Sequence, residues 1–61
     1  MQYFVLFFVD GKIINTDFYD ESGEAFSASE IHADRGDFDS RKFDSVVFEV
    51  KDGLPVHIRS Y

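Results

Sequence analysis

The sequence predicts one α+β domain in which two β-hairpins flank a short helix (ββαββ, a single antiparallel sheet). Three observations support this class. An aromatic and β-branched run from Tyr3 to Val9 leads into Asp10-Gly11, and a second such run leads into Asp52-Gly53. Between them, the segment from Ser27 to Glu30 fits a helix capping box. A chain of 61 residues without a linker predicts a single domain over residues 1–61.

The first hairpin is expected over about residues 2–19. Asp10-Gly11 is typical of a type I′ turn, and a two-residue loop sets the register of both strands. One face then pairs Phe7 with Ile14, Val5 with Thr16 and Tyr3 with Phe18. The other face pairs Phe8 with Ile13, Leu6 with Asn15 and Phe4 with Asp17.

The second hairpin is expected over about residues 41–61. A two-residue Asp52-Gly53 loop would set Phe48 opposite His57 and divide the apolar side chains between the faces. A three-residue loop that includes Lys51, with Gly53 as a bulge, keeps them together, and we therefore predict it. It pairs Val50 with Leu54, Phe48 with Val56 and Val46 with Ile58. Pro55 has no N–H group to donate, which predicts an edge position for the last strand.

The helix is expected over about residues 28–35. Ser27 is the predicted N-cap, Glu30 reaches back to it, and Phe26 and Ile31 form a hydrophobic staple. Gly36 is the predicted stop. As an alternative, residues 24–27 form an extra strand and the chain is an all-β small barrel.

A short helix can cover one face of the sheet only. The predicted core face contains Val5, Phe7, Ile14, Phe18, Val46, Phe48, Val50, Val56 and Ile58, closed by Phe26, Ala28 and Ile31. The opposite side of the first hairpin carries a second apolar stripe for which the chain has no cover. We therefore predict that a partner chain, either a second copy in a homodimer or a target protein, completes the sheet at this self-association stripe of Phe4, Leu6, Phe8 and Ile13.

The charge balance excludes several functions. Twelve acidic against six basic side chains give a net charge of −6, so direct binding of nucleic acid through its phosphates and binding to an anionic membrane are not expected. The chain has no Cys, which removes disulfides and thiolate zinc sites. The longest apolar run is too short to span a bilayer, and Met1 is expected to begin a small reading frame without a signal peptide. These features predict a cytoplasmic location.

No catalytic motif is present, so we expect no enzyme activity and no cofactor. His32 and His57 lie beside acidic residues without a nucleophile elbow or a phosphate-binding loop. The acidic segment from Asp34 to Asp44 lacks the ligand order of a calcium loop, and no metal site is expected.

The acidic residues predict a partner-binding surface. A negative surface attracts basic sites, which in cells most often handle nucleic acid. We therefore expect an inhibitor that occupies a basic site of a nucleic-acid-processing target, with Tyr19, Phe38 and Phe43 as aromatic anchors. In size and charge the chain resembles the DNA-mimic and anti-CRISPR inhibitors of phages. The alternative is a homodimeric structural module without catalytic activity. The predicted acidic surface comprises Asp17, Asp20, Glu21, Glu24, Glu30, Asp34, Asp37, Asp39 and Asp44.

Overall fold

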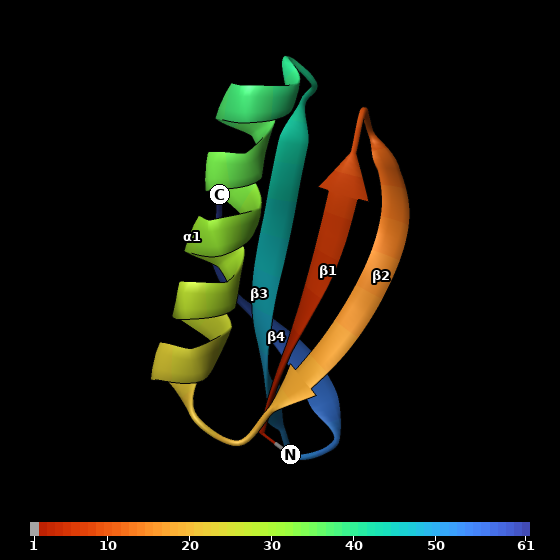
Figure 1. The fold of residues 1–61 in the computed structure, drawn as a ribbon. Helices are drawn as coiled ribbons and strands as arrows, with labels where there is room; N and C mark the ends of the chain where they lie inside the picture. Colours follow the sequence, from red (N-terminus) through yellow and green to blue (C-terminus); the bar gives the residue numbers. More distant parts are fainter. Residues whose placement is uncertain (1) are drawn as a thin grey trace.

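A computed structural model describes residues 2–61, which form one antiparallel sheet and one helix (Figure 1). The elements are β1 (Tyr3–Val9), β2 (Lys12–Tyr19), α1 (Ser22–Asp39), β3 (Phe43–Lys51) and β4 (Leu54–Ser60). The strand order is β2-β1-β3-β4, and α1 lies against one face of the sheet. The predicted ββαββ α+β class is confirmed. The barrel alternative is wrong, because residues 24–27 belong to α1.

The two central strands are β1 and β3, and the two edge strands are β2 and β4. The central position of β1 explains why this strand is apolar on both of its faces: it has neighbours on both sides and carries the middle of each surface. The edge position of β4 agrees with the presence of Pro55 in it.

The first turn is confirmed, but the register beyond it is not as predicted. Asp10 and Gly11 have φ angles of 52° and 81°, as a type I′ turn requires, and Phe8 pairs with Ile13. A register shift then falls between Phe7 and Phe8, so that Phe7 pairs with Asn15 instead of Ile14. Such a bulge inserts one extra residue into β2 and moves every later side chain to the other face. The predicted pairs Val5–Thr16, Tyr3–Phe18, Leu6–Asn15 and Phe4–Asp17 are therefore wrong, and Phe4 pairs with Phe18.

The three-residue loop predicted for the second hairpin is also wrong. Asp52 and Gly53 have φ angles of 51° and 77°, and Lys51 pairs with Leu54 across a two-residue turn. Phe48 consequently lies opposite His57. The longer loop would be required only if Val46, Phe48 and Val50 faced the helix. In the structure α1 covers the other face of β3, so no such requirement exists.

The helix is longer than predicted at both ends. It begins after Glu21, the N-cap residue, whose side chain makes no capping hydrogen bond, and Ser27 lies inside it. The predicted capping box and staple are therefore wrong. The helix continues through Gly36 and ends at Ser40, which has a φ of 56° and donates its N–H to the Gly36 carbonyl at 3.1 Å.

The core lies between α1 and the middle of the sheet. Small side chains at the contact let the helix approach β3 closely: Ala25 and Ser29 of α1 and Ser45 of β3 are fully buried. The predicted core residues Val5 and Phe7 are confirmed, and Phe26 and Ala28 pack against them partly buried. The others are wrong. Ile14, Phe18, Ile31, Val56 and Ile58 are exposed, and Val46, Phe48 and Val50 are only half-buried. The buried residues are Val5, Phe7, Val9, Ala25, Ser29, His32, Ser45 and Val47.

Gly36 is required by packing rather than by backbone conformation. A Cβ atom at this position would lie 3.0 Å from the Cβ of Phe43 and 3.1 Å from the carbonyl oxygen of Arg41. We expect Gly36→Ala to lower the free energy of unfolding by about 1 kcal/mol, although Ala is the better helix former, because the crowding exceeds the propensity gain. Gly23→Ala is the control, since a Cβ there meets no atom within 4 Å. It should raise stability by up to about 1 kcal/mol in urea titrations. Equal effects of both substitutions would contradict the packing role.

Candidate functional site

A row of aromatic rings crosses all four strands on the face of the sheet that α1 leaves uncovered. We call this face the open face. Phe4 of β1 stacks on Phe48 of β3, with ring centres 4.9 Å apart and planes 15° apart. Phe18 of β2 lies 5.9 Å from Phe4 on one side, and His57 of β4 lies 6.0 Å from Phe48 on the other. No helix or strand of residues 2–61 lies over these rings, so they are only partly shielded from solvent.

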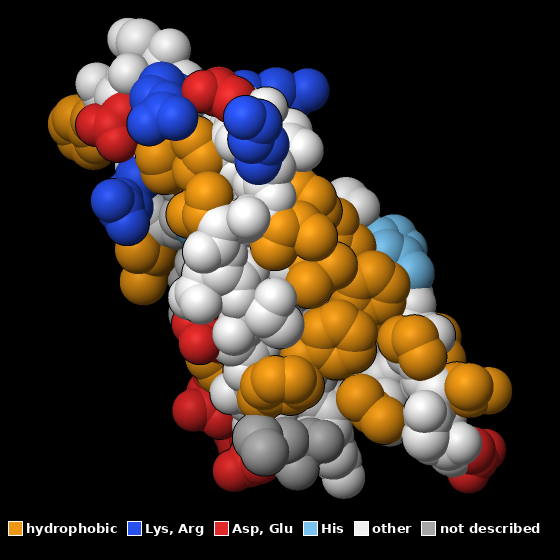
Figure 2. Space-filling model, turned by 90° about the vertical axis from the view of Figure 1, so that its right-hand side faces the viewer, with side chains coloured by type: hydrophobic (Ala, Val, Ile, Leu, Met, Phe, Trp, Pro, Cys, Tyr) orange, Lys and Arg blue, Asp and Glu red, His pale blue; other side chains and the backbone are white. Residues whose placement is uncertain are grey.

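The open face also contains the predicted self-association stripe. Phe4, Leu6 and Phe8 alternate along β1 on this side, and Ile13 pairs with Phe8. Figure 2 shows a continuous apolar band along the face. Four further members of this face were expected in the core instead, because the residue pattern indicates neither the register shift of the first hairpin, which moves Phe18, nor the face of β3 that α1 covers. These four residues are Phe18, Val46, Phe48 and Val50.

The open face is uneven along its length. A hollow of about 340 Å³ lies near the β3–β4 turn, and its lining residues are Phe4, Thr16, Phe18, Val50, Gly53 and Pro55. Ile13 occupies the opposite end, next to the β1–β2 turn, where 58% of its surface is exposed. The same face therefore offers a depression at one end and a protruding apolar side chain at the other.

Charged side chains lie at the ends of the open face. Lys12, Arg41 and Lys42 lie at the end that holds the β1–β2 turn, and Figure 2 shows Lys and Arg side chains at one end with Asp and Glu side chains among them. Asp44, which pairs with Phe8 in the sheet, approaches Lys42 to 4.0 Å. The opposite end contains the β2–α1 connection with Asp20 and Glu21, and the β3–β4 turn with Asp52. At the end with the β1–β2 turn the charges offset one another, because Asp10 pairs with Arg41 and Asp44 lies near Lys42, whereas acidic side chains predominate at the opposite end, where Lys51 is paired with Glu49.

The nine acidic residues of the predicted partner surface are divided among several places. Glu30, Asp34 and Asp37 follow the helical repeat on the side of α1 that points away from the sheet, and all three are exposed. Asp17 lies in β2 beside a groove under the helix, and Asp44 lies on the open face. Asp20, Glu21 and Glu24 surround the start of α1, and Asp39 ends it. The nine residues therefore form no single surface: three lie along the outer side of α1, three lie around its start, and the others are separate.

The three predicted aromatic anchors differ in accessibility. Phe38, near the end of α1, is 87% exposed. Phe43 packs its ring 4.9 Å from His32 and lies under the Arg35 guanidinium. Tyr19 packs against the core, and burial, aided by the carboxylates of Asp17 and Glu24, raises the pKa of its hydroxyl. Only Phe38 is free to enter a partner's pocket without loss of internal packing.

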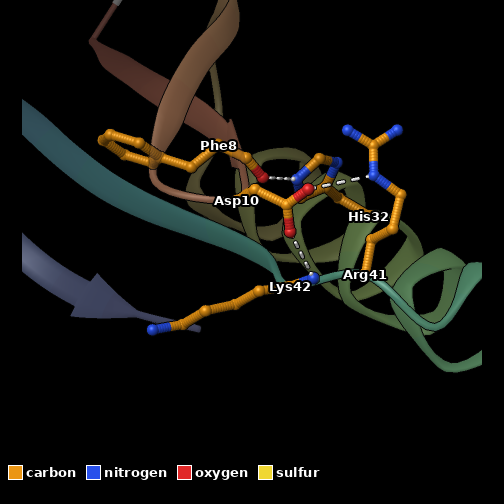
Figure 3. A network of polar contacts seen from close by, with 5 residues as sticks. All are labelled: Phe8, Asp10, His32, Arg41 and Lys42. Carbon is orange, nitrogen blue, oxygen red and sulfur yellow. Dashed lines mark hydrogen bonds and ion pairs between the residues drawn. The ribbon is translucent and has the colours of Figure 1, made fainter.

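The end with the β1–β2 turn is organised by Asp10 (Figure 3). Its carboxylate accepts hydrogen bonds from the Lys42 backbone N–H at 3.0 Å and from the Arg41 side chain at 3.1 Å. The Asp10 N–H donates to the Lys42 carbonyl at 2.7 Å. These contacts tie the β1–β2 turn to the segment that leads from α1 into β3, and they hold the pKa of Asp10 below its usual range.

The lowered pKa of Asp10 predicts a pH-dependent contribution to stability. A carboxyl group whose pKa is lower in the folded state stabilises the fold fully above its unfolded pKa, and this contribution is lost as the pH falls through the folded value. Asp10→Asn keeps the turn, because Asn tolerates positive φ, but cannot carry the charge. The difference in unfolding free energy between the wild type and this variant should be constant near neutral pH and shrink below about pH 4. A difference independent of pH would contradict the charge-assisted contact.

The two histidines are far from equivalent and form no common site. His32 is buried, and its Nε2 donates a hydrogen bond to the Phe8 carbonyl at 2.8 Å, beside the register shift of the first hairpin (Figure 3). His57 is exposed and shares a hydrogen bond with the Ser60 hydroxyl. A groove of about 290 Å³ between α1 and β2 borders His32 and is lined mainly by Phe7, Ile14 and Ile31. His32 thus contributes to the packing of α1 on the sheet. The acidic residues beside it in the sequence did not indicate this role.

Two kinds of feature are absent from the described part of the chain. Among residues 2–61 no three His, Asp or Glu side chains come together as candidate metal ligands. The helix over residues 22–39 is not apolar enough to cross a membrane, and residues 2–61 hold no other helix.

Comparison with known proteins found no matching family model, no matching curated protein and no matching solved structure.

Proposed function

We propose that this chain is a non-catalytic protein-binding module whose binding surface is the open face of its sheet. The observation that carries the proposal is the aromatic row of Phe18, Phe4, Phe48 and His57, which runs across all four strands without a covering element. Charged side chains border this row at the ends of the face, as they border the apolar centre of a protein interface.

The energetics favour a covered open face. Phe18 is 55% exposed and Ile13 is 58% exposed, and burial of such a side chain contributes about 1.5–3 kcal/mol when it is complete. The partly exposed rings of Phe4 and Phe48 would add to this. A contiguous apolar surface of this kind on a domain of this size is typical of an interaction site.

A pair of matched double variants tests the proposal. Ile13→Ser with Phe18→Ser removes two exposed apolar side chains from the open face. Ile31→Ser with Phe38→Ser removes the same residue types from α1, where they are 64% and 87% exposed. Immobilised wild type and variants are used to capture proteins from a lysate of the source cell, further copies of the chain included. We expect the open-face variant to lose the captured protein and the helix variant to retain it. Retention by both would overturn the open face as the binding surface.

A second candidate function uses the opposite side of the molecule. Glu30, Asp34 and Asp37 on the outer side of α1 favour the predicted occlusion of a basic nucleic-acid-binding site. Reversal of these three to Lys should abolish capture of a partner that elutes at moderate salt. Reversal of Asp17, Glu21 and Asp39 changes the net charge equally and should weaken capture far less. Equal losses would point to net charge alone, and no loss would end this candidate.

A further inference from the structure

We propose that a second copy of this chain covers the open face, with the strands of the two copies antiparallel. This inference rests on the proposed function and names the occupant and its orientation. The arrangement is a sandwich of two sheets with the helices on the outside. A two-fold axis between the sheets runs across the strands, so each strand lies over the same strand of the second copy in reverse direction.

The shape of the open face is complementary to itself in this orientation. Because β2 lies over the reversed β2 of the second copy, Ile13 of one copy lies over Phe18 of the other. Phe18 lines the hollow of about 340 Å³, and Ile13 protrudes at the opposite end of the same face. Each copy therefore inserts a protruding side chain into the depression of the other. With parallel strands, the two hollows would face each other and stay unfilled.

The charges favour the same orientation. Each copy has a net charge of −6, and the end with the β3–β4 turn holds Asp20, Glu21 and Asp52. Parallel strands would bring these two acidic ends together. Antiparallel strands separate them along the 38 Å length of the molecule and place each one near the end of the second copy where Arg41 and Lys42 offset Asp10 and Asp44. Like charges side by side cost affinity, so repulsion between the acidic ends disfavours parallel strands.

The size of the face sets the expected strength. Four strands about 4.8 Å apart and about 25 Å long make a face of roughly 500 Å². A standard interface buries about 800 Å² on each partner, so this one lies below that size. The dimer is expected to dissociate on dilution in the micromolar range. Its centre is apolar and both copies are acidic, so added salt should not weaken it, whereas a basic partner would be released.

Sedimentation equilibrium over a concentration series, at low and high salt, measures the association. The wild type and the Ile31→Ser/Phe38→Ser variant should form dimers at both salt concentrations. The Ile13→Ser/Phe18→Ser variant should remain monomeric with an unchanged circular dichroism spectrum. A wild type that stays monomeric at all concentrations would overturn the second copy as occupant, as would a dimer that persists in the open-face variant.

Spin labels test the orientation, and the absence of cysteine makes single labelling straightforward. A label at Asp52→Cys should give a distance between the two copies that is a large part of the 38 Å molecular length. Two labels at Lys42→Cys should likewise be far apart in the dimer. A mixture of the two labelled chains should add a short distance, between position 52 of one copy and position 42 of the other. A short distance between two labels at position 52 would overturn the antiparallel arrangement.

The lysate capture separates failure of this inference from failure of the proposed function. A monomeric wild type that still captures another protein through Ile13 and Phe18 overturns the second copy and leaves the open face as the binding surface. A wild type that neither dimerises nor captures another protein through the open face overturns both proposals.

Discussion

Substitution of Val47 by Asp is expected to unfold the protein. Val47 is fully buried under α1 in the centre of the sheet. A carboxylate there would have no cationic or hydrogen-bonding partner, and its burial costs several kcal/mol beyond the lost apolar contacts. A domain of this size is stable by only about 5 kcal/mol, so one such change removes most of its stability. Loss of the far-ultraviolet circular dichroism signal and of the urea transition would report the effect.

The neighbouring residue supplies a matched control. Val46 has the same side chain, but it lies on the open face opposite Leu6 and is half-buried. Val46→Asp should leave the monomer folded, because the new carboxylate can reach water, and should weaken binding through the open face. The sequence-based register placed Val46 in the core and Val47 outside it. If Val46→Asp unfolds the chain and Val47→Asp does not, the face assignment of β3 is wrong.

Replacement of His32 by Ala should lower the free energy of unfolding by about 3 kcal/mol. The ring packs between Phe7, 5.0 Å away, and Phe43, 4.9 Å away, and its Nε2 donates to the Phe8 carbonyl. The substitution creates a cavity and leaves a carbonyl without this donor. Urea denaturation monitored by Tyr fluorescence measures the loss.

Two further variants identify the cause. His57 is exposed and bonds only to Ser60 among the described residues, so His57→Ala should cost less than about 1 kcal/mol. His32→Phe retains an aromatic ring but has no hydrogen-bond donor. Its free energy of unfolding should lie between those of the wild type and His32→Ala. Equal stability of His32→Ala and His57→Ala would contradict a structural role for His32.

Local sequence signals predicted the features that depend on a few adjacent residues. Asp10-Gly11 and Asp52-Gly53 both form two-residue turns with positive φ, and the runs that flank them are strands. Phe4, Leu6 and Phe8 lie, as predicted, on the side of β1 opposite Val5 and Phe7, where they are half-buried, and their role in self-association stays a prediction. The second turn was missed only because a face argument was given more weight than the turn signal itself.

The helix boundaries were missed because the local capping signal at Ser27 competes with packing. Residues 22–27 join the helix since Ala25 and Ser29 reach the sheet together only on one continuous helix. Gly36, a stop signal in isolation, stays helical because its lack of a side chain permits the close contact with Phe43. Most helix stability in proteins comes from such packing rather than from local propensity.

The ββαββ order, the turn positions, the acidic charge and an apolar surface too large for one helix to cover all follow from the residue pattern. Which face of each hairpin the helix covers depends on packing in three dimensions. A strand side chain changes face with every one-residue shift, so the register shifts opposite Phe7–Phe8 and Val47–Phe48 reassign whole sets of residues. The shift in the first hairpin puts Phe18 beside Phe4, and the two-residue turn of the second puts Phe48 beside His57. The aromatic row on the open face exists only for this reason.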